Sequence, residues 1–122
     1  MLIEKFYKDT LELQSSLKFI RAGARKEIYF KGEDVKAAIV TCGGLCPGLN
    51  VVIRSIVMCL YREYGVKEIY GIKWGYRGFY EQFPKHWMPL DPKVVENIHD
   101  LGGTILGSSR GGFNAKEMVK SL

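Results

Sequence analysis

Three glycine-rich segments in this chain are of a type that could hold a phosphate-bearing ligand. They are Gly43-Gly-Leu-Cys-Pro-Gly48, Gly75-Tyr-Arg-Gly-Phe-Tyr80 and Gly107-Ser-Ser-Arg-Gly-Gly112. Glycine has no Cβ, so the backbone N–H groups of such a segment can approach a phosphate closely. A helix that begins directly after the segment adds partial positive charge at the same place. Each segment taken by itself is equally consistent with a plain structural turn.

Arg110 is the side chain of these segments best suited to bind phosphate. It stands between Ser109 and Gly111-Gly112, and the two glycines leave space for a ligand against the main chain. A guanidinium offers a rigid fork of donors to phosphate oxygens. For this loop alone an arginine in a solvated turn is the favoured interpretation. Two such loops that converge on one crevice favour ligand binding instead.

Other chemical groups give weaker signals. Tyr76 and Arg77 could flank an adenine or a ribose by stacking and cation–π contact, or could belong to a loop anchored by one tyrosine. His86 and His99 stand in no pattern with a partner, so we assign them no catalytic role. Gly43 and Gly48 have the spacing of a P-loop, but Leu49-Asn50 replace its Lys-Ser/Thr, which excludes a Walker-type kinase.

Composition places the chain among ordinary globular proteins. It has 122 residues, 47% of them hydrophobic, and 18 basic against 13 acidic residues give a net charge of +5. That surplus suits phosphate-bearing ligands in general, and we expect neither a nucleic acid nor a membrane as partner. Three cysteines without a secretory signal favour a reducing compartment, and cytoplasmic is the expected location. We expect the cysteines to be small buried residues beside the first glycine turn: Cys42, Cys46 and Cys59.

The elements around the first loop predict a βαβ unit. Residues 36–42 form a short apolar run that is typical of a buried strand. Apolar residues then recur at helical spacing from 49 to 64, namely Leu49, Val52, Ile53, Ile56, Val57, Leu60 and Tyr64. Gly65 is suited to end that helix, and residues 68–74 read as a second strand. The fold class is therefore α/β with a parallel sheet.

A second unit follows the same order. Asp91 and Pro92 predict the start of a helix that ends at Gly102-Gly103, with Val94, Val95, Ile98 and Leu101 on its buried face. Residues 104–106 suit a third strand, and Asn114 with Glu117 predicts a further helix whose apolar face begins with Met118, Val119 and Leu122. The three glycine segments would then leave the carboxyl ends of neighbouring strands, where open α/β sheets bind ligands.

The chain divides into two parts by composition. Residues 1–35 carry seven basic and six acidic residues and read as a leader or arm, whereas residues 36–122 hold most of the glycine. The apolar pattern stops inside the last predicted helix. We therefore expect the chain to be the N-terminal part of a longer protein.

Three ordered blocks resemble the phosphofructokinase family, in its plant and protist type. They are Thr41-Cys-Gly-Gly-Leu-Cys-Pro-Gly-Leu-Asn50, Gly75-Tyr-Arg-Gly-Phe79 and Gly102-Gly-Thr-Ile-Leu-Gly-Ser-Ser-Arg-Gly-Gly112. Arg21-Ala-Gly-Ala-Arg-Lys-Glu-Ile-Tyr-Phe30 is similar to the segment that precedes the body in that subgroup, so the resemblance covers about residues 20–122. Leu45 stands where bacterial members have aspartate, which favours the plant-type subgroup.

The resemblance implies a function and four site residues. Members transfer a phosphoryl group from ATP to the 1-hydroxyl of fructose 6-phosphate in glycolysis, with Mg²⁺ bound to the donor. By resemblance Gly44 lies against the donor phosphates, Arg110 and Gly111 contact the nucleotide, and Tyr76 lies near the adenosine. The metal ligands, the catalytic base and the sugar-phosphate arginines of the family are expected beyond Leu122. A complete enzyme is expected to be a homotetramer.

Alternatives stay open at this point. A pyrophosphate-dependent enzyme of the same superfamily shares these blocks, because donor choice depends on residues after position 122. A truncated, non-catalytic nucleotide-binding chain is a rival of another class. An α/β domain unrelated to the family, with two chance glycine loops, is the third reading.

Overall fold

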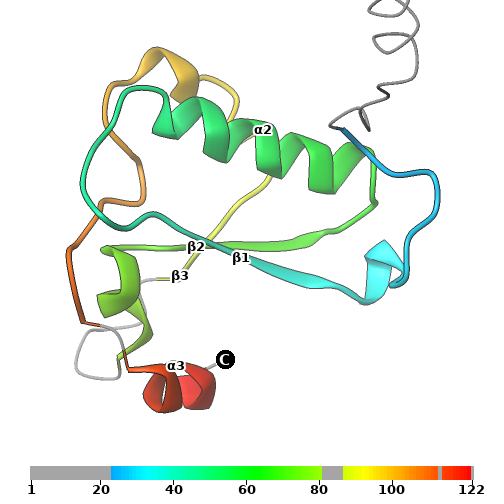
Figure 1. The fold of residues 1–122 in the computed structure, drawn as a ribbon. Coiled ribbons are helices and arrows are strands. Elements are labelled where there is room, and N and C mark those ends of the chain that lie inside the picture. The colour runs from blue at the N-terminus through cyan, green and yellow to red at the C-terminus, as the bar shows by residue number, and fades with distance from the viewer. Residues whose placement is uncertain (1–22, 81–86, 113, 122) are drawn as a thin grey trace, which may run out of the picture.

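The computed structural model describes residues 23–80, 87–112 and 114–121. Strands β1 (Lys36–Val40), β2 (Glu68–Ile72) and β3 (Trp87–Pro89) form one sheet in that order. Helix α2 (Leu49–Arg62) lies on one side of the sheet, and helix α3 (Ala115–Ser121) lies on the other side (Figure 1). The predictions made for residues 1–22, for His86 and for Leu122 lie outside the described residues. None of the helices in the described part of the chain is long and apolar enough to cross a bilayer.

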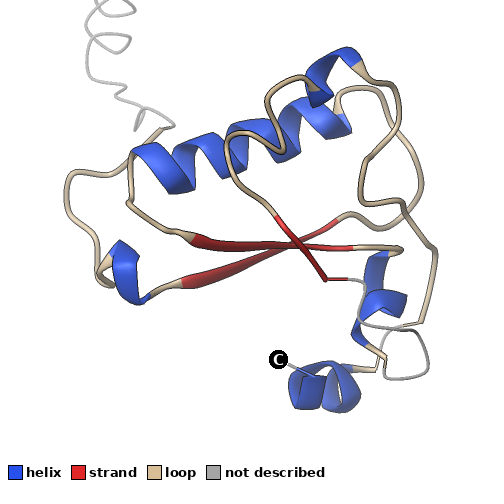
Figure 2. Cartoon of the chain, turned by 180° about the vertical axis from the view of Figure 1, so that it is seen from behind, coloured by secondary structure: helices blue, strands red, loops and turns tan. Residues whose placement is uncertain are grey.

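The predicted βαβ unit is present. Strand β1 (Lys36–Val40) pairs in parallel with β2 (Glu68–Ile72), in a register that matches Lys36 to Glu68 and Val40 to Ile72. Helix α2 (Leu49–Arg62) connects the two strands and covers one face of the sheet, as Figure 2 shows from behind. The carboxyl ends of β1 and β2 therefore lie at the same end of the sheet, where their following loops start.

Helix α2 ends as predicted but buries a narrower stripe than its sequence indicates. Gly65 has a φ of +71°, and the N–H of Val66 bonds to the carbonyl of Leu60 at 2.9 Å, which is a glycine-based helix stop. The buried positions are Asn50, Ile53 and Val57. Val52 and Ile56, expected on the buried face, are 54% and 39% exposed, because the helix meets the core along the 50–53–57 line.

The sheet is mixed rather than purely parallel. A short strand that the sequence did not indicate, β3 (Trp87–Pro89), pairs antiparallel with β2 and matches Ile72 to Trp87. Three residues are too few for an alternating pattern to be visible. The indole of Trp87 meets the ring of Phe79 at a centroid distance of 6.2 Å, which anchors the strand to the 3₁₀ helix η2 (Gly75–Phe79).

The helix predicted over 91–101 is replaced by turns. Asp91 caps the segment, since its Oδ1 accepts the N–H groups of Lys93 and Val94 at 2.7 and 2.9 Å. Residues 92–97 then form successive turns and Ile98–Asp100 the 3₁₀ helix η3. Asn97 lies at φ −115° and ψ 10°, outside the helical region, so a regular helix cannot continue. Val95 and Ile98 still reach the core, whereas Val94 and Leu101 are exposed.

The strand predicted over 104–106 is also absent. Gly103 and Gly107 both have positive φ, so the chain turns on either side of the three residues. Their N–H groups bond to side chains instead of a ladder: Ile105 to Asn50 at 2.9 Å and Leu106 to Thr104 at 3.2 Å. Leu106 remains a core residue, 1% exposed.

The last predicted helix is present as α3 (Ala115–Ser121). The backbone carbonyl of Asn114 accepts the N–H of Met118 at 3.0 Å, and its side chain lies 3.5 Å from the N–H of Glu117. The apolar face expected to start with Met118 and Val119 is not buried among the described residues. The core itself lies between α2 and the sheet: Ile53, Val57, Val66, Ile69, Leu90, Val95, Ile98 and Leu106.

Candidate functional site

A cleft of about 570 Å³ lies where the loops after β1 and β2 meet the segment 102–110. Figures 1 and 2 both show that segment running beside the loop that joins β1 to α2. The volume is within the range of small-molecule sites, about 300–1,000 Å³. Its lining residues come from three separate stretches of chain: Gly44, Leu45, Lys73, Trp74 and residues 102–110.

Gly44 and Arg110 lie against each other in this cleft. A Cβ on Gly44 would stand 3.4 Å from the Nη2 atom of Arg110, and Gly44 has a φ of +114°. Ser108 fixes the approach, since its Oγ accepts the N–H of Gly44 at 3.1 Å and lies 3.2 Å from the carbonyl of Gly44. The N–H of Gly43 also bonds to the carbonyl of Ser109 at 3.0 Å. The predicted convergence of the first and third glycine loops is therefore present.

Thr41 ties the end of the first strand to the third loop. It is 9% exposed, and its hydroxyl donates to the carbonyl of Gly107 at 2.6 Å and lies 3.2 Å from the hydroxyl of Thr104. A buried polar group needs such partners, because an unpaired one is destabilising. Thr41 thus connects the start of the first glycine loop to the third glycine loop.

Asn50 connects helix α2 to the cleft segment in the same way. The sequence analysis did not single out this residue. The residue is 2% exposed, its Nδ2 donates to the carbonyl of Leu101 at 2.9 Å, and its Oδ1 accepts the N–H of Ile105 at 2.9 Å. Both backbone groups belong to the cleft segment. A signal was present in the sequence, because position 50 falls on the same helix line as Ile53 and Val57.

The end of β2 contributes two further lining residues that sequence reasoning did not single out, Lys73 and Trp74. The backbone of Trp74 bonds to the third loop twice: its N–H to the carbonyl of Leu106 at 2.8 Å, and its carbonyl to the hydroxyl of Ser109 at 2.7 Å. Gly75 follows so closely against Ser109 that a Cβ there would lie 2.6 Å from its Oγ. The three loops thus form one connected surface.

Gly111 and Tyr76 lie outside the described lining of the cleft. Gly111 directly follows Arg110, has a φ of +74°, and would meet nothing within 4 Å with a Cβ. A hydrogen bond with Cys42, the negative charge of the Cys42 thiolate that forms at high pH, and desolvation raise the pKa of Tyr76 above its ordinary 10.0. Tyr76 therefore supports the residue that directly precedes Gly43.

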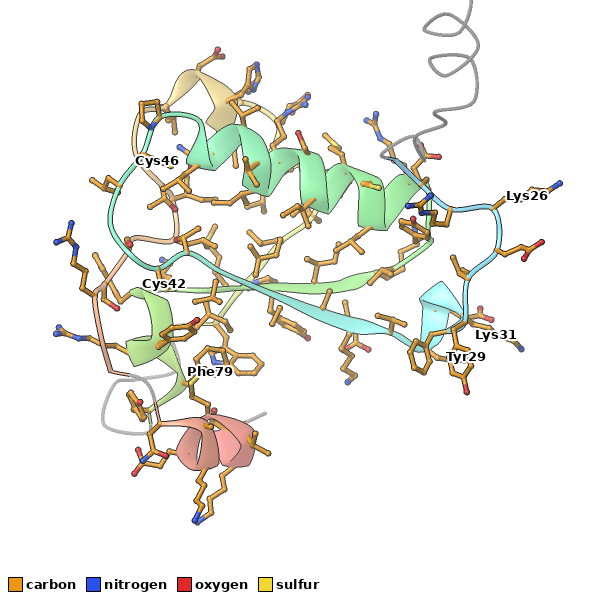
Figure 3. All side chains as sticks on the ribbon, viewed as in Figure 1. Lys26, Tyr29, Lys31, Cys42, Cys46 and Phe79 are labelled. Atoms are coloured by element: carbon orange, nitrogen blue, oxygen red, sulfur yellow. The ribbon has the colours of Figure 1, made fainter. Side chains whose placement is uncertain are left out.

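The cysteines differ from the expectation of buried residues. Cys42 and Cys46 are exposed on the loop between β1 and α2 (Figure 3), and Cys59 is partly buried. The loop turns through Gly43, Gly44 and Gly48, all at positive φ, which carries it away from the core. None of the three cysteines is in a disulfide.

The electrostatics of the cleft suit an anion. Arg110 is exposed and makes no ion pair within the described residues, and Lys73 adds a second cation. Gly48 precedes helix α2 as an N-cap without a side-chain hydrogen bond, and the first turn holds no acidic residue, so the partial positive charge of the helix start is not neutralised locally. In residues 23–80, 87–112 and 114–121, no group of three or more His, Cys, Asp or Glu side chains could hold a metal ion.

Known proteins similar to the chain agree on one family. A family model described as phosphofructokinase matches residues 36–122. The chain is 49% identical over all 122 residues to ATP-dependent 6-phosphofructokinase 2 of Arabidopsis thaliana and covers 27% of that protein. It is 59% identical to ATP-dependent 6-phosphofructokinase 1 of the same plant over 85% of the chain and 21% of the relative.

A bacterial relative shows similar agreement. The ATP-dependent 6-phosphofructokinase of Borreliella burgdorferi is 55% identical over 84% of the chain and 23% of its own length. The chain thus spans about a quarter of the length of the curated relatives it matches.

Proposed function

The chain belongs to the phosphofructokinase family, and on that premise we propose that it supplies the donor-binding loops of an ATP-dependent 6-phosphofructokinase. The reaction is transfer of the terminal phosphoryl group of ATP to the 1-hydroxyl of fructose 6-phosphate, a step of glycolysis. The observation that carries the proposal is the meeting of Gly44 and Arg110 in one cleft.

The proposed roles follow from the chemistry of each group. Gly44 leaves room for a phosphate beside the main chain, and Arg110 directs a fork of N–H donors to phosphate oxygens. Phosphoryl transfer depends mainly on positioning and on stabilisation of the charge that develops on the transferred group. A guanidinium fixed beside the donor loop serves both purposes. Gly111 extends the open backbone next to Arg110 for contact with the rest of the nucleotide.

Tyr76 and Lys73 complete the proposal at the edges of the cleft. We retain Tyr76 as a contact near the adenosine, reached from its position beside Cys42. Lys73 lines the cleft and adds positive charge where the donor would lie.

Mg²⁺ and the catalytic base are not assigned to these residues. The described cleft offers backbone, hydroxyl and cationic groups, and its residues do not form a cluster of acidic ligands suited to Mg²⁺. We propose that the ligands of this ion, the base and the groups that hold fructose 6-phosphate lie beyond Leu122. A homotetramer is the proposed assembly of the complete enzyme.

The test is a donor comparison on the full-length protein. Purified enzyme is assayed for fructose 1,6-bisphosphate formation from fructose 6-phosphate and Mg²⁺, with either ATP or pyrophosphate. We expect turnover with ATP and little with pyrophosphate. Turnover with pyrophosphate alone would assign the other donor class, and folded protein that binds nucleotide without turnover would indicate a non-catalytic chain.

A further inference from the structure

Trp74 has a backbone conformation that its residue type rarely adopts. Its φ is 64° and its ψ 33°, and among the described residues it is the one non-glycine with positive φ. In this left-handed region the Cβ crowds the backbone, so a bulky side chain there is strained. Such strain persists only where the surroundings over-determine it, and it concentrates at functional sites.

The third glycine loop supplies that constraint. The N–H and the carbonyl of Trp74 bond to Leu106 and to the hydroxyl of Ser109 at 2.8 and 2.7 Å. The residue is thereby held on both sides by the segment that carries Arg110. Its side-chain direction is fixed relative to the donor cleft by backbone contacts and not by burial in the core.

The indole lies over a glycine and opens to the cleft. A Cβ on Gly107 would stand 2.6 and 2.8 Å from the Cε3 and Cζ3 atoms of the ring, so the indole rests directly on the main chain of that residue. Gly107 itself has a φ of +66°. Trp74 is nevertheless 52% exposed and lines the cleft with Gly44 and Arg110.

The two tryptophans of the chain are used differently. The other tryptophan, Trp87, packs edge-on against Phe79 and near Tyr70, which is the usual use of an indole in a core. The ring of Trp74 is instead a fixed, half-exposed aromatic surface beside a cationic phosphate cradle. Nucleobases stack on such rings irrespective of base identity, because every base has a π-face.

We infer that Trp74 is the stacking platform for the base of the phosphoryl donor. This inference rests on the proposed function and deepens it, since it names a residue that favours a nucleoside triphosphate over a donor without a ring. The triphosphate lies at Gly44 and Arg110, and the base covers the exposed face of the indole. Pyrophosphate and tripolyphosphate, which have no base, bind at Gly44 and Arg110 only.

The experiment separates the base from the phosphates. Dissociation constants of ATP and of inorganic tripolyphosphate are measured by calorimetry for the full-length wild type and for Trp74→Ala and Trp74→Phe. Loss of a stacking ring weakens base binding by a factor of about 5 to 150. We expect Trp74→Ala to weaken ATP by that range and to leave tripolyphosphate unchanged, while Trp74→Phe stays close to the wild type. Unchanged ATP affinity in Trp74→Ala, or equal weakening of both ligands, would overturn the inference.

A second variant excludes a general loss of folding. Trp74→Gly removes both the ring and the strain, whereas Trp74→Ala removes only the ring. We expect Trp74→Gly to melt at a higher temperature than Trp74→Ala and to lose the same ATP affinity. Recovery of ATP affinity in Trp74→Gly would show that the strain and not the ring mattered, and would reject the stacking role. A wild type that binds tripolyphosphate but shows no preference for ATP refutes the inference alone, and one that binds neither refutes the proposed function.

Discussion

Arg110 owes its suitability for phosphate to its immediate neighbours. Ser108 and Ser109 hold the loop against the first glycine turn and the end of β2, and Gly111 leaves the other side open. The guanidinium is therefore positioned by backbone and hydroxyl contacts that do not use its own donors. Toward the other described residues those donors make no hydrogen bond, which suits them to a ligand.

Replacement of this arginine tests its role directly. In the full-length enzyme we expect Arg110→Ala to lower kcat/KM for ATP by about 10²–10³, the usual effect of losing one preorganised charge-stabilising donor. Steady-state kinetics at saturating fructose 6-phosphate provide the measurement. Arg110→Lys keeps the positive charge but loses the planar fork of donors, so its kcat/KM for ATP should lie between those of the wild type and Arg110→Ala. Wild-type kinetics in a folded Arg110→Ala enzyme would refute the assignment.

Gly44 makes a second prediction at this scale. Gly44→Val places a branched side chain at a φ of +114° and brings its Cβ to 3.4 Å from Arg110, so we expect it to abolish binding of labelled ATP to the full-length protein. Thr41→Ser is the matched control. It keeps the hydroxyl that bonds to Gly107 and Thr104, and its effect on binding should be small. Wild-type affinity in Gly44→Val would show that the loop is only structural.

Cys42 and Tyr76 form a pair that pH can probe. The hydrogen bond with Cys42, the negative charge of the Cys42 thiolate and desolvation favour the neutral phenol and raise the pKa of Tyr76 above 10.0. A raised pKa means that this contribution to stability is complete below the unfolded value of 10.0 and is lost as the pH rises through the folded value. We expect Cys42→Ala to lower the pKa of Tyr76 toward 10.0 in an NMR titration of labelled tyrosine. An unchanged titration would remove Cys42 as the cause.

At the scale of elements, helix α2 and the segment 101–105 are joined through Asn50. The side chain of Asn50 hydrogen-bonds to the carbonyl of Leu101 and to the N–H of Ile105, in a segment that does not pair with a strand of the described sheet. Together with the bonds from Thr41 and Trp74, these two bonds fix the glycine-flanked turn as a wall of the cleft.

The effect of removing this contact is a loss of stability. Asn50→Ala leaves two backbone groups without partners beside a core position, and each such group is destabilising by about 1–3 kcal/mol. We expect a free energy of unfolding lower by that order, measured by urea denaturation of the full-length protein. Asn50→Asp keeps the acceptor for Ile105 but sets a buried carboxylate against the carbonyl of Leu101, so at neutral pH its loss should be at least as large as that of Asn50→Ala. Equal stability of wild type and Asn50→Ala would contradict this role.

At the scale of the whole molecule, the described part of the chain uses two of its acidic residues for structure. The chain covers 27% of the first Arabidopsis relative. Asp91 caps a turn, and Glu68 pairs with Lys36 at 2.9 Å. The cleft presents donors of hydrogen bonds and positive charge.

We therefore expect residues 1–122, purified on their own, to give no phosphofructokinase turnover. A general base alone contributes about 10²–10⁴ to a rate, and the described lining of the cleft contains no aspartate, glutamate or histidine that could serve as one. The measurement is a coupled assay with fructose 6-phosphate, Mg²⁺ and ATP or pyrophosphate, after circular dichroism has shown that the chain is folded. The full-length protein is the positive control. Turnover of about one per second, within the kinase range, would contradict the expectation.

The sequence by itself determined those features that local chemistry decides. Helical spacing and Gly65 defined α2, and apolar runs defined β1 and β2. Asn114 marked the start of helix α3 correctly, whereas Asp91 caps a run of turns and not the helix that was predicted there. Glycine loops next to a helix start and the Ser-Ser-Arg-Gly-Gly segment indicated the candidate site. These signals are legible because each depends on residues within a few positions of one another.

Only the tertiary structure decided the features that depend on distant partners. Residues 104–106 became a turn because Asn50 and Thr104 take their N–H groups, and Val52 became exposed because α2 meets the core along another line. The strained backbone of Trp74 exists because Leu106 and Ser109 hold it. No pattern along the chain encodes such contacts, since their energy arises between segments that folding alone brings together.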